Sequence, residues 1–477
     1  MSNAKNFYID GKWVAPAKPR DMDVIDPSTE EVCETISLGD QADTDAAVAA
    51  ARRAFASWSQ TSPADRIAVA EKLLEVYNAR SEDMAQAISR EMGAPQDLAR
   101  AQQVGAGSWH LGGFIKAAKD FVWDHPLGDW APTERTVYEP IGVCALITPW
   151  NWPMNQIVLK VVPALLTGCT MILKPSEISP LSGILFSELM DEAGVPAGVY
   201  NMVNGDGPGV GSQLSVHKDV DMVSFTGSTR AGRLISKAGA ETIKRISLEL
   251  GGKGANIIFA DADEKAVKQG VIRCFRNTGQ SCNAPTRMLV ERARYDEAVE
   301  QAAEAAAKVT VGPASEEGRH IGPAVSELQF NKIQDLIQVG IDEGARLIAG
   351  GTGRPENLNR GYYIRPTVFA DVTPDMTIYR EEIFGPVLSI MPFDSEEEAI
   401  AIANDTDYGL TNYVQTGDVE KLRRVGLQLR SGMVEGNGQG FAQGSPFGGY
   451  KQSGNGREGG RFGLHEFLET KAISGWG

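Results

Sequence analysis

Short apolar runs of strand length alternate with helical segments between residues 141 and 260, and this alternation constrains the fold most strongly. Several of the runs end in Gly, Pro or Ser: IGVCALITPW, CTMILKPSE, VYNMVNGDG, MVSFTGST and RISLELGGK. Such strand–helix–strand alternation predicts a parallel sheet with crossover helices. Because ligands bind beyond the carboxyl ends of the strands in such sheets, we expect a binding site at these polar ends.

The rest of the chain predicts a second domain, a helical layer and a protruding segment. Between residues 254 and 447 the runs GANIIFADAD, TRMLVERARY, VLSIMPFD and NYVQTGD again alternate with helical stretches, which predicts a second α/β domain. Apolar residues at three- and four-residue spacing predict helices from about 40 to 120. Residues 121–140 fit neither domain, and we expect an exposed hairpin there that serves subunit contacts.

Composition and charge narrow the classes of function. The net charge of -16 disfavours nucleic acid or an anionic membrane surface as a partner, because both attract basic proteins. The N-terminus lacks a basic region followed by an apolar stretch, and no window approaches the ~18 apolar residues of a membrane span. The five cysteines form no CxxC pair and the five histidines have no metal-ligand spacing. We therefore expect a cytoplasmic protein without a disulfide framework or a metal.

Two residues stand out as candidates for chemistry. Cys282, in RNTGQSCNAPTR, lies beside Gly279 and small polar residues, whereas the other four cysteines lie in apolar or helical contexts. Taken alone, a free cysteine is more typical of an inert buried thiol than of a nucleophile. Glu249, in SLELGGK, ends an apolar run, where a carboxylate either forms a salt bridge or works as an acid or base. Neither alternative is favoured for Glu249 on its own.

Other polar segments follow the predicted strands. Asn151, between two tryptophans, is either a turn residue or a donor to a developing oxyanion. Lys174 and Glu177 could grip ribose hydroxyls, and a carboxylate there favours NAD over its 2′-phosphorylated form. The segment FTGSTRAG opens a helix whose free N–H groups suit a pyrophosphate, although this pattern alone is weak. The glycine-rich segments NGDGPGVG, EEIFGPV and SPFGGYKQSGNGREGGRFG are typical of loops.

Taken together and in this order, these segments resemble the aldehyde dehydrogenase superfamily over nearly the whole chain. The resemblance rests on TPWNWP, KPSE, FTGST, LELGGK, GQSC, EEIFGPV and PFGGYKQSGNGRE. It implies that Cys282 is the nucleophile and Glu249 the general base. Asn151 and the backbone N–H of Cys282 would form the oxyanion hole, and Lys160 and Glu458 a proton relay behind the base.

The resemblance also implies NAD as the cofactor, with NADP less favoured, and no catalytic metal. Lys174 and Glu177 would hold the adenosine ribose, Ser228 the pyrophosphate and Glu382 the nicotinamide ribose. The full set of implied cofactor contacts is Thr148, Trp150, Lys174, Ser176, Glu177, Gly207, Pro208, Phe225, Gly227, Ser228, Leu250, Gly251, Glu382 and Phe384.

The partner would be a small-molecule aldehyde, which is oxidised to a carboxylic acid. The positions expected to line its tunnel are Trp152, Asn155, Gln156, Leu159, Ser281, Asn283, Phe441 and Phe447. No arginine stands among these eight, which disfavours short aldehyde acids, and Asn283 differs from the best-known members of the family. Glu249 favours hydrolysis over transfer to coenzyme A. A coenzyme-A-acylating relative, a semialdehyde-specific relative and a non-catalytic binding protein remain alternatives.

The implied architecture is an α/β fold in three parts. A Rossmann-like NAD-binding domain would take residues 1–121 and 141–250, and a catalytic α/β domain would take residues 251–450. A small β arm for oligomerisation would combine residues 122–140 with 451–477. Dimers or tetramers are usual in the family, so we expect a homo-oligomer.

Overall fold

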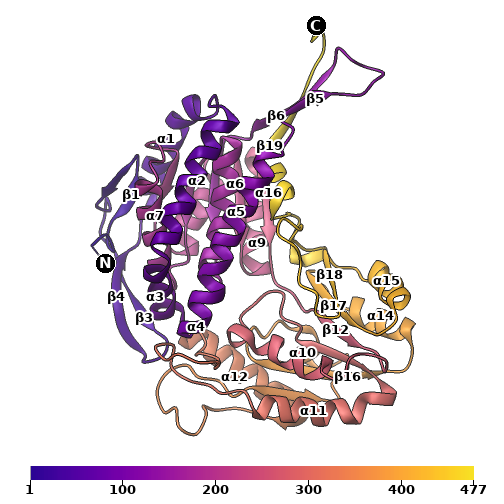
Figure 1. Ribbon diagram of the computed structural model, residues 1–477. Coiled ribbons are helices and arrows are strands. Elements are labelled where there is room, and N and C mark those ends of the chain that lie inside the picture. The colour runs from indigo at the N-terminus through magenta and orange to yellow at the C-terminus, as the bar shows by residue number, and fades with distance from the viewer. Residues whose placement is uncertain (1, 477) are drawn as a thin grey trace.

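The computed structural model describes residues 2–476 and contains two seven-stranded sheets flanked by helices, with a narrow β arm projecting from one end (Figure 1). The first sheet has the order β11 (Arg245–Glu249), β10 (Met222–Thr226), β7 (Val143–Ile147), β8 (Thr170–Lys174), β9 (Tyr200–Met202), β1 (Phe7–Ile9) and β2 (Lys12–Val14). The second has the order β14 (Arg346–Ala349), β15 (Thr367–Ala370), β16 (Val387–Phe393), β13 (Arg287–Glu291), β12 (Ala255–Ile258), β17 (Thr411–Gln415) and β18 (Met433–Gly436). The prediction of a mixed α/β fold with two parallel sheets is confirmed.

The first sheet is parallel from β11 to β9, with β1 and β2 added antiparallel at one edge. Its central strands β7, β8 and β10 are buried along their whole length, as parallel strands covered on both faces must be. The two short strands β1 and β2 were not predicted, because three residues are too few to show a strand period.

The faces of the first sheet are covered by helices that precede its central strands in the sequence and by helices that connect those strands (Figure 1). The predicted helical region holds α1 (Gln41–Trp58), α2 (Pro63–Ala79), α3 (Ser81–Met92) and α5 (Gly105–Lys119). Helix α1 begins at a capping box between Asp40 and Asp43, and α2 begins with Pro63 behind the capping residue Ser62. Helix α6 (Pro153–Thr167) lies between β7 and β8 in the chain and is buried on nearly every face. It therefore forms the centre of the largest apolar core.

The second sheet is parallel from β15 to β18 and antiparallel at β14. It is flanked by α10 (Ala266–Phe275), α11 (Tyr295–Ala307), α12 (Glu327–Asp342), α14 (Glu396–Asn404) and α15 (Val419–Gln428). The strand pair β3 (Asp21–Asp26) and β4 (Glu31–Ser37) lies beside the first sheet, and its turn contacts the second part of the chain. There Arg354 Nη2 donates to Glu30 Oε1 at 2.8 Å.

The arm is a three-stranded sheet of β5 (Asp124–Pro126), β6 (Arg135–Pro140) and β19 (Leu468–Ile473). The expected hairpin at 121–140 is present, and the C-terminal strand pairs with it (Figure 1). Only the end of the predicted 451–477 segment joins the arm. Helix α16 (Gly460–Glu466) instead packs on α5, because Gly463 lies directly against the Phe114 ring. The three-domain division itself stays a prediction.

Large apolar side chains remain uncovered on the arm: Trp130 is 81% exposed and Leu127 47%. Apolar exposure of this kind on a projecting element is typical of a surface that contacts another protein. No helix among residues 2–476 is long and apolar enough to cross a membrane.

Candidate active site

Cys282 lies on the loop between α10 and β13, where this loop meets the carboxyl end of the first sheet. Asn151 Nδ2 donates to the Gln280 carbonyl at 3.0 Å, and Trp152 Nε1 donates to Ser281 Oγ at 2.8 Å. On the other side, a Cβ atom at Gly252 would collide with the Cys282 carbonyl oxygen. The glycine pair of LELGGK therefore allows the turn after β11 to lie directly against the cysteine loop.

Two pockets meet at Cys282, and this residue lines both of them. The pocket on the side of the first sheet has a volume of about 200 Å³. The pocket on the other side has a volume of about 300 Å³ and opens between α5, α6 and the loop at 441–447. A thiol at such a junction can reach a ligand in either pocket.

The pocket of the first sheet is formed by the carboxyl ends of β7, β10 and β11, as predicted for a parallel sheet. Seven of the expected cofactor contacts line it: Trp150, Gly227, Ser228, Leu250, Gly251, Glu382 and Phe384. Trp150 and Phe384 face one another edge to face at 5.5 Å. Ser228 caps the start of α9 (Thr229–Gly239) by accepting from Ala231 N. Pro149, Thr226, Gln329 and Lys332 also line this pocket and were not predicted.

Glu382 reaches this pocket from the second part of the chain. Its Oε1 accepts from Gly252 N at 2.8 Å, and its carbonyl oxygen accepts from Lys332 Nζ at 3.0 Å. A Cβ atom at Gly251 would overlap Glu382 Oε2, so a side chain at this position would displace the carboxylate. Burial raises the pKa of the Glu382 carboxyl. The turn after β11 thus fixes both the cysteine loop and this carboxylate.

The other seven expected cofactor contacts lie further along the same edge of the sheet, outside the 200 Å³ pocket. Lys174, which ends β8, donates through Nζ to the Pro175 carbonyl at 2.9 Å and to Glu177 Oε2 at 3.3 Å. Ser176 Oγ accepts from Ile178 N. Thr148 directly follows β7, Phe225 lies within β10, and Gly207 and Pro208 lie in the turn that follows β9.

Glu249 ends β11 and is buried, and neither of its carboxylate oxygens has a hydrogen-bond partner among residues 2–476. The glycine-rich segment near the C-terminus covers it. Gly448, at φ 154°, leaves no room for a side chain, since a Cβ atom would lie 2.7 Å from Glu249 Oε1. Leu250 N donates to the Ser453 carbonyl at 2.9 Å, which attaches this segment to the end of β11. The loop that the sequence predicts at 445–463 therefore forms part of the site.

Lys160 and Glu458 form a buried ion pair at 2.6 Å behind Glu249. Lys160 comes from α6, and its side chain is 1% exposed. Burial and the charge of Glu458 raise the pKa of the Glu249 carboxyl well above its ordinary value, while Lys160 opposes this shift. A carboxyl with a raised pKa and no fixed partner is suited to exchanging a proton.

A family model described as the aldehyde dehydrogenase family matches residues 13–473. The chain belongs to the aldehyde dehydrogenase family. It is 53% identical to a 3-succinoylsemialdehyde-pyridine dehydrogenase of a Pseudomonas species, over 100% of this chain and 99% of that one. Its activity is the oxidation of an aldehyde.

Solved structures give the same result. An aldehyde dehydrogenase of Bartonella henselae is 60% identical with a TM-score of 0.98, covering 99% of both chains. Aldehyde dehydrogenase C of Pseudomonas syringae, a cysteine-to-alanine mutant complexed with NAD⁺ and octanal, is 49% identical with a TM-score of 0.98, covering 100% of this chain and 98% of that one. Betaine aldehyde dehydrogenase of Staphylococcus aureus, complexed with NAD⁺, is 38% identical with a TM-score of 0.95, covering 99% and 95%.

The 300 Å³ pocket of this aldehyde dehydrogenase contains all eight residues that were expected to line the tunnel. It is also lined by residues that sequence reasoning did not place there: Gln102, Ala106, Trp109, His110, Arg273, Arg276, Ala284, Met433, Ala442, Ser445 and Pro446. Two of these further residues, Arg273 and Arg276, are arginines, so the absence of arginine from the eight predicted positions does not hold for the whole pocket. Arg276 begins the segment RNTGQSC and precedes Cys282 by six positions in the sequence.

The two arginines of this pocket differ in their contacts. Arg273 is paired with the buried carboxylate of Glu435. Arg276 is exposed at the pocket and has no hydrogen bond or ion pair within residues 2–476. His110, which also lines this pocket, is uncharged near neutral pH, because burial lowers the pKa of its imidazole to about 4. Arg276 is thus the cation that a ligand could reach.

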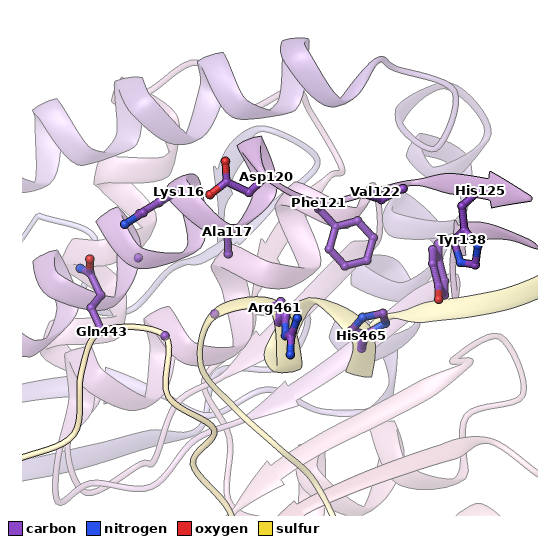
Figure 2. Close-up of a pocket in the computed structure, with 13 residues that line it drawn as sticks. Lys116, Ala117, Asp120, Phe121, Val122, His125, Tyr138, Gln443, Arg461 and His465 are labelled. Carbon is purple, nitrogen blue, oxygen red and sulfur yellow. The ribbon is translucent and has the colours of Figure 1, made fainter.

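A separate cavity of about 470 Å³ lies at the base of the arm and contains none of the expected site residues. Figure 2 shows Lys116 of α5, Asp120 directly after this helix, Tyr138 of β6, and Arg461 and His465 of α16 around it. No cluster of three or more His, Cys, Asp or Glu side chains in the described part of the chain could hold a metal ion.

The electrostatics of the site predict that activity rises with pH. Burial and the carboxylates of Glu382 and Glu249 raise the pKa of the Cys282 thiol, and burial raises that of Glu249. A thiol acts as a nucleophile and a carboxyl as a base only when deprotonated, so in the roles expected for Cys282 and Glu249 a lower pH removes both reactive forms. We expect kcat/KM for an aldehyde to increase from about pH 6 to about pH 9. A profile that falls over this range, measured by the rate of NADH formation, would contradict the assignment.

Proposed function

We propose that this enzyme oxidises an aldehyde to its carboxylic acid with NAD, through a thioester on Cys282 that is hydrolysed by water activated by Glu249. One observation carries the proposal: the Cys282 thiol lies at the junction of two pockets, one formed by the carboxyl ends of the parallel strands and the other lined by aromatic residues. A reaction between a nucleotide on one side and an aldehyde on the other requires this placement.

The residues of the first pocket fit a dinucleotide. The N-terminal turn of helix α9, capped by Ser228, points its first N–H groups toward this pocket, which suits a pyrophosphate, and the hydroxyl of Thr226, buried beside it, has no partner among residues 2–476. NAD, when bound, supplies the acceptor for the hydride of the substrate. The carboxylate of Glu177 would bind ribose hydroxyls and repel a 2′-phosphate, so we propose NAD rather than NADP. The solved relatives that hold NAD⁺ support this proposal.

In the first half of the proposed reaction, Cys282 gives its proton to Glu249, which passes it on to solvent before the second half, and the sulfur bonds to the aldehyde carbon. The carbonyl oxygen becomes an oxyanion, which the Asn151 amide and the backbone N–H of Cys282 would stabilise. Asn151 Nδ2 uses one of its two N–H donors on the Gln280 carbonyl, so the other is free for the oxyanion. A single donor of this kind is typically worth ~2.7–4 kcal/mol in barrier height. Loss of hydride from the former aldehyde carbon then leaves an acyl group on sulfur.

In the second half, Glu249 takes a proton from a water molecule, which attacks the acyl carbon and releases the carboxylic acid and the Cys282 thiolate. The unpartnered oxygens of Glu249 and the glycines that cover it support this role, because they leave the carboxylate free to move and to bind water. The buried Lys160–Glu458 pair lies where it could pass the proton onward. A carboxylate so placed also argues against coenzyme A as the acyl acceptor.

Substituting Glu249 by glutamine tests the proposal. Because the amide cannot accept the proton of water, Glu249→Gln should form NADH in a burst of at most one equivalent per active site and then stall. The measurement is stopped-flow absorbance at the nicotinamide wavelength with aldehyde and NAD in excess.

The matched variant Cys282→Ala should show no burst while still binding NAD, because it lacks the nucleophile. Unchanged steady-state turnover in Glu249→Gln would remove this carboxylate from the mechanism. Turnover that appears only when coenzyme A is added would instead favour the acylating alternative.

The aldehyde pocket favours a substrate larger than acetaldehyde. Its wall combines Trp152, Phe441 and Phe447 with the cation Arg276. The named relatives act on a pyridine semialdehyde or bind octanal, and both ligands have an extended body beyond the aldehyde. We propose an aromatic or medium-chain aldehyde, with Arg276 available to a distal polar group such as a ketone, ring nitrogen or carboxylate.

A pair of aldehydes that differ only in a distal carbonyl or carboxylate group tests the role of Arg276. We expect wild-type kcat/KM to favour the polar member, and Arg276→Met to reduce that preference about tenfold, the worth of one charge-assisted hydrogen bond. Arg319→Met, which changes an arginine outside both pockets, is the control. Equal preference in wild type and Arg276→Met would show that Arg276 does not contact the substrate.

We also propose that the enzyme is a cytoplasmic homo-oligomer assembled through the arm. The exposed Trp130 and Leu127 support this proposal, since they would otherwise leave apolar surface in water. The negative net charge disfavours nucleic acid and anionic membranes as partners.

A further inference from the structure

Tyr413, on β17, donates a hydrogen bond from its hydroxyl to the carbonyl oxygen of Asn283 at 2.5 Å. Asn283 directly follows Cys282, so this bond ends one residue from the proposed nucleophile. Tyr413 is 1% exposed, and burial raises the pKa of its phenol. The hydroxyl is therefore a permanent donor near neutral pH.

An ion pair holds the Tyr413 ring in place. Arg273 of α10 donates hydrogen bonds from Nη1 and Nη2 to the carboxylate of Glu435 on β18, and the distance from Nη2 to Oε2 is 2.6 Å. The Cζ atom of Arg273 lies 4.5 Å from the centre of the Tyr413 ring. Tyr413 and Glu435 are direct neighbours in the parallel pairing of β17 and β18. The Glu435 side chain is 1% exposed. A carboxylate buried so deeply is stable only when paired, so the Arg273 geometry is fixed.

This Tyr413–Arg273–Glu435 unit supports the cysteine loop from the second sheet. The first sheet supports the same loop through Asn151, which binds the Gln280 carbonyl. The loop is thus held on both sides of the nucleophile, by an amide before it and by a phenol after it. Neither Tyr413 nor Glu435 lines the pockets that meet at Cys282, so neither is placed to touch a substrate or NAD.

We propose that Tyr413 is a positioning residue, which holds the Asn283 carbonyl and so sets the direction of the Cys282 thiol and backbone N–H, and that the Arg273–Glu435 ion pair holds Tyr413. Removing the hydroxyl would leave the part-buried Asn283 carbonyl without this donor, and the peptide between Asn283 and Ala284 could then rotate. Such a rotation changes the backbone of Asn283 and thereby shifts the adjoining Cys282, with its sulfur and its oxyanion-binding N–H, and positioning errors of this kind reduce the chemical step. The inference rests on the proposed role of Cys282 as nucleophile.

The direct test is Tyr413→Phe, which keeps the ring under Arg273 and removes only the hydroxyl. We expect kcat to fall about tenfold, equivalent to the loss of one buried hydrogen bond, with the Kd for NAD unchanged. The rate at which iodoacetamide alkylates Cys282, followed by mass spectrometry of its peptide, should fall in parallel. This rate reports the thiol alone and requires no turnover.

Glu435→Gln provides a second variant of nearly the same shape, which weakens the ion pair behind the ring. We expect a smaller loss of kcat and of alkylation rate in the same direction. The double variant should be no slower than Tyr413→Phe alone, because both changes act through one hydrogen bond. This non-additivity also distinguishes positioning from general destabilisation.

Tyr379→Phe is the matched control. Tyr379 is another buried tyrosine of the second part of the chain that lies beneath arginines, and its hydroxyl donates to Asp405 at 3.1 Å, away from the cysteine loop. Its substitution should lower the melting temperature without changing kcat or the alkylation rate of Cys282.

Wild-type kcat and alkylation in Tyr413→Phe would overturn the proposal, as would equal losses in the Tyr379→Phe control. A failure of the proposed hydrolytic mechanism can be distinguished from a failure of this proposal. It would be seen as unchanged steady-state turnover in Glu249→Gln, whatever the rate at which Cys282 is alkylated in Tyr413→Phe.

Discussion

The site depends on the close contact between the turn after β11 and the loop that carries Cys282. Gly252 allows this contact, because any side chain there would occupy the space of the Cys282 carbonyl oxygen. The same turn binds the carboxylate of Glu382 through the Gly252 N–H. Two sheets that come from different parts of the sequence thereby meet beside Cys282, with a pocket on either side of the thiol. The proposed chemistry needs this junction more than it needs any single side chain.

Charge is concentrated behind the junction and shielded from water. Glu249 is buried, neither of its carboxylate oxygens has a hydrogen-bond partner in the described part of the chain, and the Lys160–Glu458 pair is buried behind it. On the opposite side of the loop, the buried Glu435 carboxylate is bound by Arg273. Buried ion pairs are weak sources of stability but hold their surroundings in one geometry when fully paired. We infer that here they fix the orientation of the groups beside Cys282.

Much of the fold follows from local sequence pattern. Five-residue apolar runs at β7, β8 and β10 predict buried parallel strands, and the ends of these strands mark the cofactor pocket. The antiparallel strands β1 and β2 leave no such signal, because each has only three residues. Residue spacing also says nothing about α16, which follows the glycine-rich segment but packs on α5.

The site was predictable only in part for a related reason. The resemblance of seven segments to one family supplied the expected roles of Cys282 and Glu249, which neither residue suggested alone. It missed Arg276 and Lys332, whose place in the pockets depends on how distant elements pack. The pairing of Arg273 with Glu435 joins residues 162 positions apart, and no pattern in a single sequence indicates such a contact.

The central claim is that the acyl group of the substrate is carried on Cys282. The most direct measurement is the intact mass of Glu249→Gln after acid quenching of a reaction with NAD and excess aldehyde, followed by peptide mapping. The account predicts an added mass equal to that of the aldehyde less a hydride and a proton, located on the peptide that contains Cys282. An unmodified protein that has formed NADH, or an acyl group on another residue, would contradict it.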